Sequence, residues 1–287
     1  MDLTDINEVR RLLFRHGIKL SKGLGQNFLV NPTVCPRMAG MAADSGTGVI
    51  EIGPGIGVLT AELARRAKRV VSIELDRRLE PVLAETLADF GNIELLWQDA
   101  LKTDLAALIT EKFSDCDKVS VCANLPYYIT SPMIMKLLED RLPIDSITAM
   151  VQLEAAQRIC APVGSRAAGA VTVAVRYYSR PGIVFRVSPG SFLPPPKVDS
   201  AVIRLDILRD GDTGGVAVSD EKLFFRMVKA GFAQRRKTLV NAVSSDSLFP
   251  KEAVAKALEK LGIDGNARIE QLTMEQLAAL SSALGAR

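Results

Sequence analysis

The stretch Val49-Ile-Glu-Ile-Gly-Pro-Gly-Ile-Gly57 decides the fold of this chain. Its apolar start, residues 49–52, predicts a short buried strand, and three glycines follow at alternate positions. Residues 58–68 then predict a helix, because apolar side chains recur there at helical spacing. A strand, a glycine turn and a helix in direct succession indicate one unit of an α/β sheet, with backbone at the turn that a ligand can approach closely.

The same unit repeats along the chain. Further strands are predicted at 69–73, 92–97, 119–123 and 146–151, separated by helices at 76–89, 101–113 and 132–140. Strands that alternate with helices pair in parallel through right-handed crossovers, so we expect a doubly wound sheet. A polar feature follows each of four strands: Gly53, Glu74, Asp99 and Asn124. Since ligands bind beyond the carboxyl ends of such strands, we expect these four features to share one rim.

The flanking regions predict other elements. Residues 4–14, with Thr4 as a cap, and residues 32–43 are expected to be helical, as are 152–161. Residues 170–178 suit a strand or a helix equally, and strands at 183–187 and 200–206 indicate an antiparallel pair at the sheet edge. The proline-rich segment between those two strands is expected to be extended. Beyond a glycine-rich linker, helices are predicted at 221–232, 235–243, 252–261 and 274–284.

Composition excludes several classes of protein. The apolar fraction is 48%, the charged fraction is 24% and the net charge is +3, as in an ordinary globular protein. We find no apolar run long enough for a membrane span and no export signal, so we expect a cytoplasmic protein. Cys35, Cys116, Cys122 and Cys160 lack paired spacing, and His16 is the single histidine. We therefore expect no metal site, no disulfide framework and no histidine-based hydrolytic triad.

The glycine loop and the next strand end suit an adenosine-bearing cofactor. The loop spacing is G-x-G-x-G, whereas dinucleotide binders have G-x-G-x-x-G. Glu74 has the position and charge to bind a ribose diol, and Asp99 can accept a hydrogen bond from an adenine amine or hold the loop that does so. S-adenosylmethionine fits a site of this kind, which need not bind a pyrophosphate. A tight turn without a ligand is the alternative for the glycine loop alone.

The segment Asn124-Leu-Pro-Tyr-Tyr128 predicts a site for an aromatic amine. Asn124 Oδ1 and the Leu125 carbonyl can accept its N–H groups, which favours a pyramidal nitrogen as it attacks a methyl group. Tyr127 would stack on the ring, and Phe192 could cover its other face. Ordinary core packing is the alternative for both tyrosines, and no role is assigned to Tyr128.

Two basic zones cluster positive charge in a way that suits phosphates. Lys222, Arg226 and Lys229 share one helical stripe, and Arg235, Arg236 and Lys237 follow. The second zone contains Arg10, Arg11, Lys19 and Lys22. A solvated helix face is the alternative for the stripe. The segment 19–31 begins basic and contains glycines, so it suits either a lid over a ligand or a plain surface loop.

Six ordered motifs resemble the ribosomal RNA adenine N6-dimethyltransferase family. They are Gly25-Gln-Asn-Phe-Leu29, Glu51-Ile-Gly-Pro-Gly-Ile-Gly57, Ile73-Glu-Leu-Asp76, Gln98-Asp-Ala100, Asn124-Leu-Pro-Tyr127 and Phe192-Leu-Pro-Pro-Pro-Lys-Val-Asp-Ser200. The resemblance extends from Gly25 to the C-terminal helices. It implies a class I, Rossmann-like methyltransferase fold with a mostly parallel seven-stranded sheet, a small all-helical C-terminal domain and S-adenosylmethionine as cofactor.

The resemblance also implies roles for individual residues and a division into domains. Cofactor binding would fall to Asn27, Leu29, Gly53, Gly55, Gly57, Glu74, Asp99 and Asn124, and the target adenine would contact Asn124, Leu125, Tyr127 and Phe192. The basic residues from Lys222 to Lys237 would bind RNA. We expect an N-terminal helix and arm at 1–30, a methyltransferase domain at 31–208 and a helical RNA-binding domain at 209–287.

The Asn-Leu-Pro-Tyr motif is similar to that of the enzymes that dimethylate two adjacent adenines near the 3′ end of small-subunit ribosomal RNA. Its expected partner is that RNA in a pre-ribosomal particle, and we expect the protein to act as a monomer. Tyr128 departs from the Asn that many relatives carry. Three alternatives stay open: a large-subunit RNA methyltransferase that confers macrolide resistance, a ribosome-assembly or transcription factor without activity, and a DNA adenine methyltransferase. The large-subunit enzymes more often have Ile after the Asn, and the DNA enzymes commonly carry Asp-Pro-Pro-Tyr.

Overall fold

The computed structural model describes residues 1–18, 26–208 and 216–285. It divides into a sheet unit, residues 1–156 with 182–207, and a helical unit formed by the described residues of 157–181 and 208–287. The helical unit thus includes residues 157–181, which the sequence assigned to the methyltransferase domain. The predicted domain limits stay a prediction. The predicted linker at 211–215 and most of the predicted arm, including Lys19, Lys22 and Gly25, lie outside the described residues.

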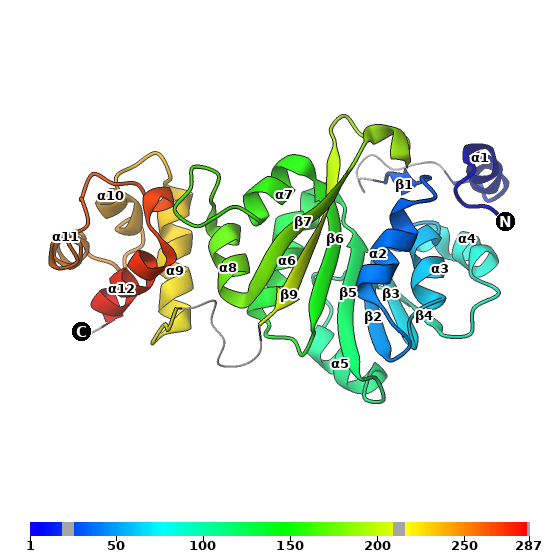
Figure 1. Cartoon of the computed structure of the whole chain (residues 1–287), viewed down its shortest axis with the longest axis horizontal. Coiled ribbons are helices and arrows are strands. Elements are labelled where there is room, and N and C mark those ends of the chain that lie inside the picture. The colour runs from blue at the N-terminus through cyan, green and yellow to red at the C-terminus, as the bar shows by residue number, and fades with distance from the viewer. Residues whose placement is uncertain (19–25, 209–215, 286–287) are drawn as a thin grey trace. The chain divides into compact units, whose positions relative to one another are not determined.

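A seven-stranded sheet organises the sheet unit (Figure 1). Its strands, in spatial order, are β4 (Ile93–Trp97), β3 (Arg69–Glu74), β2 (Thr47–Ile52), β5 (Lys118–Asn124), β6 (Ser146–Gln152), β9 (Ser200–Ile207) and β7 (Ser179–Val187). The first five pair in parallel, whereas β9 pairs antiparallel with β6 and β7 forms the edge. The predicted doubly wound, mostly parallel sheet is therefore confirmed.

The strand order places a ligand site between β2 and β5. From β2 the chain builds outward to β3 and β4, then returns to the other side of β2 to form β5 and β6. The strand order reverses at this point, so the loops after β2 and β5 diverge and leave a crevice. The glycine loop follows β2 and Asn124 ends β5, which puts the two predicted motifs at this crevice.

Helices cover both faces of the sheet. In the sheet unit they are α1 (Ile6–Arg15), α2 (Val34–Ala42), α3 (Val58–Ala64), α4 (Glu80–Thr86), α5 (Leu105–Lys112) and α6 (Thr130–Glu139). In Figure 1, α2 lies in front of the sheet and α6 lies behind it. All six residues of β2 are buried, as expected for a central parallel strand covered on both faces. One apolar cluster joins α1, α2, α3 and α4 to the sheet, with Leu12, Met38 and Leu63 fully buried.

The helical unit has its own apolar core. It contains α8 (Ala170–Tyr178), α9 (Glu221–Ala233), α10 (Leu239–Val243), α11 (Lys251–Lys260) and α12 (Met274–Gly285), whereas α7 (Leu153–Ile159) crosses the limit between the units. Tyr178 stacks on Phe225 with ring centroids 5.3 Å apart, and Tyr177 meets Phe225 edge to face at the same distance. Such contacts stabilise aromatic cores beyond simple burial of area.

Several predicted helix limits were wrong for identifiable physical reasons. Helix α5 begins at Leu105 rather than Leu101, because the Asp104 side chain caps it by accepting from Ala107 N. Helix α10 begins at Leu239 rather than Arg235, because a turn closes from Lys237 N to Gln234 O and Thr238 is extended. The ambiguous segment Ala170–Tyr178 is helix α8.

Two further limits differ near the start of the chain. Asp5, and not Thr4, caps α1, since the Asp5 carboxylate accepts from Asn7 N whereas Thr4 donates its hydroxyl to Asp2. Helix α3 ends at Ala64 instead of continuing to Lys68. The predicted extended segment contains the two-residue strand β8 (Phe192–Leu193), which pairs with β1 (Phe28–Leu29).

Candidate active site

A cavity of about 250 Å³ lies at the carboxyl ends of β2, β3 and β5. The predicted residues that line it are Asn27, Leu29, Gly53, Gly55, Glu74, Asp99, Asn124, Leu125, Tyr127 and Phe192. Gly57 does not line it and instead precedes α3 with a φ of 90°. The structure thus brings together side chains that are up to 165 residues apart in the chain, from Asn27 to Phe192. The roles assigned to these residues stay predictions.

The glycine loop needs glycine at Gly55 for two reasons. Its φ is +60°, a left-handed conformation that L side chains rarely adopt. A Cβ there would also lie 3.1 Å from the Phe28 ring, which walls the cavity. The missing side chain therefore allows the loop to pack against Phe28 while its backbone faces the cavity.

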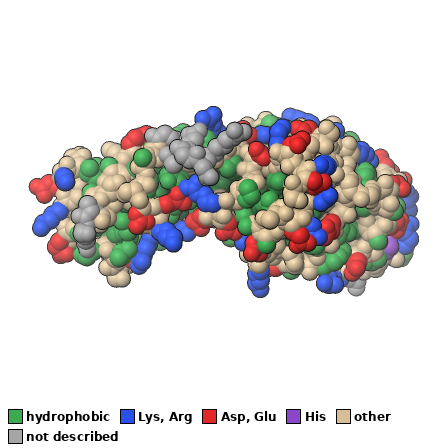
Figure 2. Space-filling model, turned by 90° about the horizontal axis from the view of Figure 1, so that it is seen from below, with side chains coloured by type: hydrophobic (Ala, Val, Ile, Leu, Met, Phe, Trp, Pro, Cys, Tyr) green, Lys and Arg blue, Asp and Glu red, His purple; other side chains and the backbone are tan. Residues whose placement is uncertain are grey.

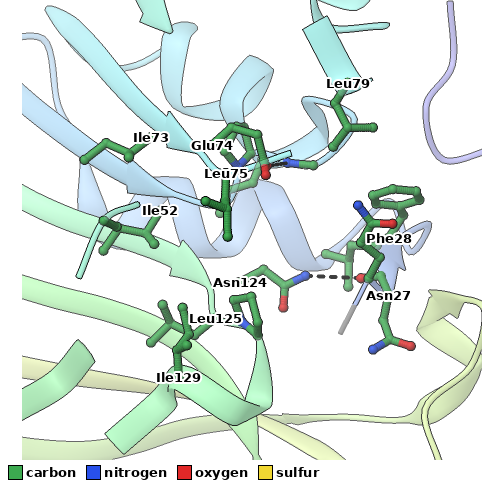
Figure 3. A pocket seen from close by; sticks show the side chains of 18 of the residues that line it. Asn27, Phe28, Ile52, Ile73, Glu74, Leu75, Leu79, Asn124, Leu125 and Ile129 are labelled. Atoms are coloured by element: carbon green, nitrogen blue, oxygen red, sulfur yellow. Dashed lines mark hydrogen bonds between the residues drawn. The ribbon is translucent and has the colours of Figure 1, made fainter. Parts of the chain in front are cut away.

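Glu74 is one of the two acidic residues that line the cavity, the other being Asp99 (Figure 3). Its Oε1 accepts from Asp76 N at 2.8 Å, and its Oε2 accepts from Gly55 N at 3.3 Å. The two bonds join the loop after β3 to the glycine loop. Burial raises the pKa of Glu74, while the backbone N–H donors act in the opposite direction. Each carboxylate oxygen keeps further acceptor capacity, so Glu74 can still accept hydrogen bonds from a ligand hydroxyl.

Asp99 and Asp76 hold the neighbouring loops. Asp99 Oδ1 accepts from Leu101 N at 2.9 Å, which supports its predicted role of shaping a loop. Asp76 accepts from Gln26 Nε2 at 2.8 Å and is also held by the Arg78 guanidinium, which leads the causes that lower the pKa of Asp76. Gln26 thereby connects the N-terminal segment to the loop after β3.

The sequence alone did not identify several lining residues. Gln26 and Gln98 contribute polar groups, and several others supply apolar surface, among them Ile52, Ile73, Leu75, Leu101 and Ile129. Most of these are immediate neighbours of predicted residues in the chain. The sequence does contain a signal that could have identified them, because the two residues that flank a strand-end residue can reach the same rim of the sheet. A flat ring and a ribose need such apolar walls as well as polar anchors.

Asn124 has a defined amide orientation. Its Nδ2 donates to the Asn27 carbonyl at 3.3 Å, as Figure 3 shows, so its Oδ1 is the atom left to accept from a ligand. The next residue, Leu125, donates its own N–H to the Met150 carbonyl on β6 at 3.1 Å. Both residues are therefore fixed by neighbouring backbone before any ligand binds.

Two aromatic rings complete this side of the cavity. The Tyr127 hydroxyl lies 2.8 Å from Ser200 Oγ, which fixes the tilt of its ring, and burial raises the pKa of Tyr127. Phe192 lies on β8, whose antiparallel pairing sets Phe192 opposite Leu29. Since Leu29 and Phe192 both line the cavity, this short strand pair forms part of its wall.

The cysteines offer no nucleophile here. Cys35 lines the cavity, but burial raises the pKa of its thiol, and the nearby Glu51 carboxyl adds to the effect. Among the described residues, no group of His, Cys, Asp and Glu is arranged to hold a metal ion. Nor does any described helix have the length and apolar character needed to cross a membrane.

The predicted RNA-binding residues lie in the helical unit. Lys222, Arg226 and Lys229 are all exposed on α9. Arg226 makes two hydrogen bonds to the Asp246 carboxylate, at 2.7 and 2.8 Å, so its charge is partly neutralised. Arg235 donates to the Arg166 carbonyl, and its Nε lies 3.7 Å from the Glu270 carboxylate. Arg236 and Lys237 are exposed in the turn before α10.

The basic residues do not form one uninterrupted patch on the face drawn in Figure 2. Lys and Arg side chains alternate there with Asp and Glu side chains. In the second predicted basic zone, Arg10 and Arg11 are exposed on α1. Its other members, Lys19 and Lys22, lie outside the described residues.

A mostly parallel seven-stranded sheet with a glycine loop and an acidic strand end beside its switch point is the arrangement expected of a class I methyltransferase. A model of the family described as ribosomal RNA adenine dimethylase matches residues 17–285. The chain belongs to this family, and the predicted resemblance is confirmed. The family and the fold imply S-adenosylmethionine as the methyl donor.

Individual relatives agree with this assignment. The ribosomal RNA small subunit methyltransferase A of Geobacillus thermodenitrificans is 46% identical over 287 residues, which cover 99% of this chain and 97% of that protein. The protein of the same name from Alkaliphilus oremlandii is 45% identical over 279 residues, or 96% of each chain.

Two solved structures are similar over most of the chain. A dimethyladenosine transferase from Plasmodium falciparum has a TM-score of 0.71 and 27% identity, covering 88% of this chain and 95% of the other. The 23S rRNA methyltransferase ErmE has a TM-score of 0.65 and 29% identity, covering 90% of this chain and 100% of the other. The prediction of an rRNA adenine dimethyltransferase is thus confirmed.

Proposed function

We propose that this chain transfers methyl groups from S-adenosylmethionine to N6 of two adjacent adenines in a hairpin loop near the 3′ end of small-subunit ribosomal RNA. The observation that carries the proposal is the orientation of Asn124, whose Nδ2 is held by the Asn27 carbonyl beside the Tyr127 ring. The substrate is the RNA of an assembling small-subunit particle in the cytoplasm, and the protein acts as a monomer.

The cavity fits the proposed cofactor. Glu74 supplies a carboxylate for a ribose diol. The backbone of the glycine loop lines the cavity at Gly55, where a Cβ would contact the Phe28 ring. The walls from Ile52, Ile73 and Leu101 give an adenine ring apolar surface. When bound, S-adenosylmethionine supplies an electrophilic methyl group. In this assignment Asn27, Leu29, Gly53, Gly55, Asp99 and Asn124 help Glu74 to bind it, and Gly57 acts indirectly by starting α3.

The residues around Asn124 make the adenine amine reactive. An aromatic amine is a poor nucleophile because its lone pair is delocalised into the ring. Asn124 Oδ1 and the Leu125 carbonyl accept hydrogen bonds from the two N–H groups, which favours pyramidal nitrogen and places its lone pair toward the methyl donor. Tyr127 stacks on the base and Phe192 covers its other face, so the ring is held outside the RNA stack.

The helical unit supplies contacts to the RNA backbone. Lys222, Arg226, Lys229, Arg236 and Lys237 are exposed, and we assign them, together with Arg235, to phosphate contacts. Arg226 must break its hydrogen bonds to Asp246 before it can bind a phosphate, and this cost lowers its net contribution to the affinity for RNA. Mutating these residues is expected to weaken binding of RNA of any sequence.

Glu74→Gln is expected to weaken binding of S-adenosylmethionine about 10- to 100-fold, because a hydrogen bond to a charged acceptor contributes about 1.5–3 kcal/mol. Isothermal titration calorimetry measures the change. The matched control is Glu94→Gln on the neighbouring strand β4, where the carboxylate pairs with Lys112 at 2.8 Å. If Glu74→Gln bound the cofactor within threefold of wild type, the assignment of Glu74 would be wrong.

Mass spectrometry of ribosomal RNA from a strain lacking this chain tests the function. We expect the paired dimethyladenosines to disappear from small-subunit RNA and to return when the wild-type chain is restored. Methylation of immature subunits by the purified protein separates the substrates. Activity on large-subunit RNA alone would favour the alternative of a large-subunit RNA methyltransferase; the similar structure of ErmE is described as a 23S rRNA methyltransferase. An absence of activity on either RNA would favour an assembly factor.

A further inference from the structure

A second cleft, of about 310 Å³, lies next to the β1–β8 strand pair, because it is lined by Asn31, which lies two residues after β1, and by Ser191, which directly precedes β8. Ser191 lines this cleft, whereas its neighbour Phe192 lines the active-site cavity. Consecutive residues of the chain therefore line the two sites, and their Cα atoms are about 3.8 Å apart. Both clefts belong to the sheet unit.

Two arginines give this cleft its charge. Arg37 extends from α2 and Arg186 from β7, and both side chains are exposed. The Arg37 guanidinium lies over the Phe185 ring, with Cζ 3.6 Å from the ring centroid. That contact restrains the guanidinium plane while its N–H edge stays able to donate. Asp199 contributes one exposed carboxylate to the lining, so the two arginines leave a net positive charge.

The floor of the cleft is polar and already ordered. Ser191 is 4% exposed, and its Oγ accepts from Asn31 Nδ2 at 3.1 Å. Asn31 Oδ1 in turn accepts from the backbone N–H and the hydroxyl of Thr33, which precedes α2. The Ser191 hydroxyl keeps its proton to donate, and the positive end of the α2 dipole adds to the field of the two arginines. These groups together suit an oxyanion.

We propose that this cleft binds a backbone phosphate of the RNA next to the target adenine. The inference rests on the proposed function, because it takes the cavity beside Tyr127 and Phe192 to be the base site. A base turned out of its stack carries its own phosphates with it, and the cleft is lined by the residue next to Phe192, which lines the base site. Arg37, Arg186 and Ser191 then hold the RNA backbone in the cleft while the base enters the neighbouring active-site cavity. The cleft acts on RNA position and not on cofactor binding.

The test compares the double variant Arg37→Ala/Arg186→Ala with wild type on a small-subunit hairpin RNA. We expect a loss of affinity of about tenfold or more, since hydrogen bonds between charged groups are lost. The slope of log K against log salt should become shallower by about 0.7 for one single-strand phosphate contact. Affinity for S-adenosylmethionine and melting temperature should not change. The matched control is Arg69→Ala/Lys118→Ala, which removes two cations from the amino ends of β3 and β5.

A chemically altered RNA identifies the phosphate. Hairpins carrying one neutral methylphosphonate, placed in turn at each phosphate around the target adenine, should bind wild type more weakly at one position. The double variant should show no further loss at that position, because the two changes remove the same contact. Additive losses at every position, or equal weakening by the control variant, would overturn the proposal. Wild-type methylation of the unmodified hairpin tests the proposed function separately.

Discussion

Asn124→Ala is expected to lower kcat for methyl transfer about 10²- to 10³-fold. That magnitude is typical when a pre-positioned hydrogen-bonding group is removed from a transition state. The variant loses Oδ1 as an acceptor for the adenine N6 amine, while Leu125 still offers its carbonyl. The rate is measured with a hairpin RNA and tritiated cofactor, both at saturating concentration, so that weaker binding of either one does not lower the measured rate.

Asn124 also holds the N-terminal segment, and a control must separate the two roles. Its Nδ2 bond to the Asn27 carbonyl is lost together with Oδ1, so cofactor affinity is expected to fall as well. A purely positioning role would raise KM and the cofactor Kd but leave kcat near wild type. Asn241→Ala, in the helical unit, is the matched control: it removes a side-chain amide that bonds Thr238 Oγ1 at 2.9 Å. Full kcat in Asn124→Ala would show that the catalytic assignment is wrong.

The central part of the fold could be predicted because short-range patterns determine it. The residues of β2, β3 and β5 are apolar runs that end in polar or glycine residues, and parallel strands bring such ends to one rim. That rule placed Gly53, Glu74 and Asn124 around one cavity. The resemblance to a family then supplied roles that spacing alone left open.

Long-range contacts account for what the sequence did not predict. The β1–β8 pair joins two-residue strands, which are too short to give a periodic signal, yet it sets Phe192 against Leu29. The stripe on α9 includes Arg226, but Asp246, 20 residues later, binds the Nε–Nη2 edge of its guanidinium with both carboxylate oxygens. Arg235, in the turn between α9 and α10, also contacts residues far from it in the chain, Arg166 and Glu270.

Glu51 has a buried carboxyl that the proposed mechanism does not use. It lies on β2 between Ser72 of β3 and Cys122 of β5, and it is fully buried. Its Oε2 accepts from Ser72 Oγ at 2.6 Å. Thr60 lies near enough to lower its pKa, but neither Thr60 Oγ1 nor Glu51 Oε1 has a hydrogen bond of normal geometry within the described residues. Burial is the dominant effect and raises the pKa of Glu51 to about 7.

Glu51→Gln is therefore expected to stabilise the protein near pH 8 but not near pH 4. Below the usual pKa of 4.5 the carboxyl is protonated in both folded and unfolded chains, so burial of a neutral group carries no charge penalty. Between pH 4.5 and about 7 the folded chain binds a proton that the unfolded chain has released, so wild-type stability falls as pH rises. The fall amounts to about 3 kcal/mol at 1.36 kcal/mol per pKa unit. Glutamine keeps an acceptor for Ser72 and does not ionise, so the stability of the variant should not decrease over this pH range.

Urea unfolding of both proteins at several pH values measures the difference. The stability of Glu51→Gln minus that of wild type should grow by about 3 kcal/mol between pH 4.5 and pH 8, with most of the rise complete by pH 7. Glu62→Gln on α3 is the matched control, because its carboxylate pairs with Arg65 and Arg66 near the surface. A difference that does not vary with pH would mean that Glu51 titrates normally in the folded chain. The carboxyl beneath the glycine loop would then be ionised and hydrated at neutral pH, in spite of its burial.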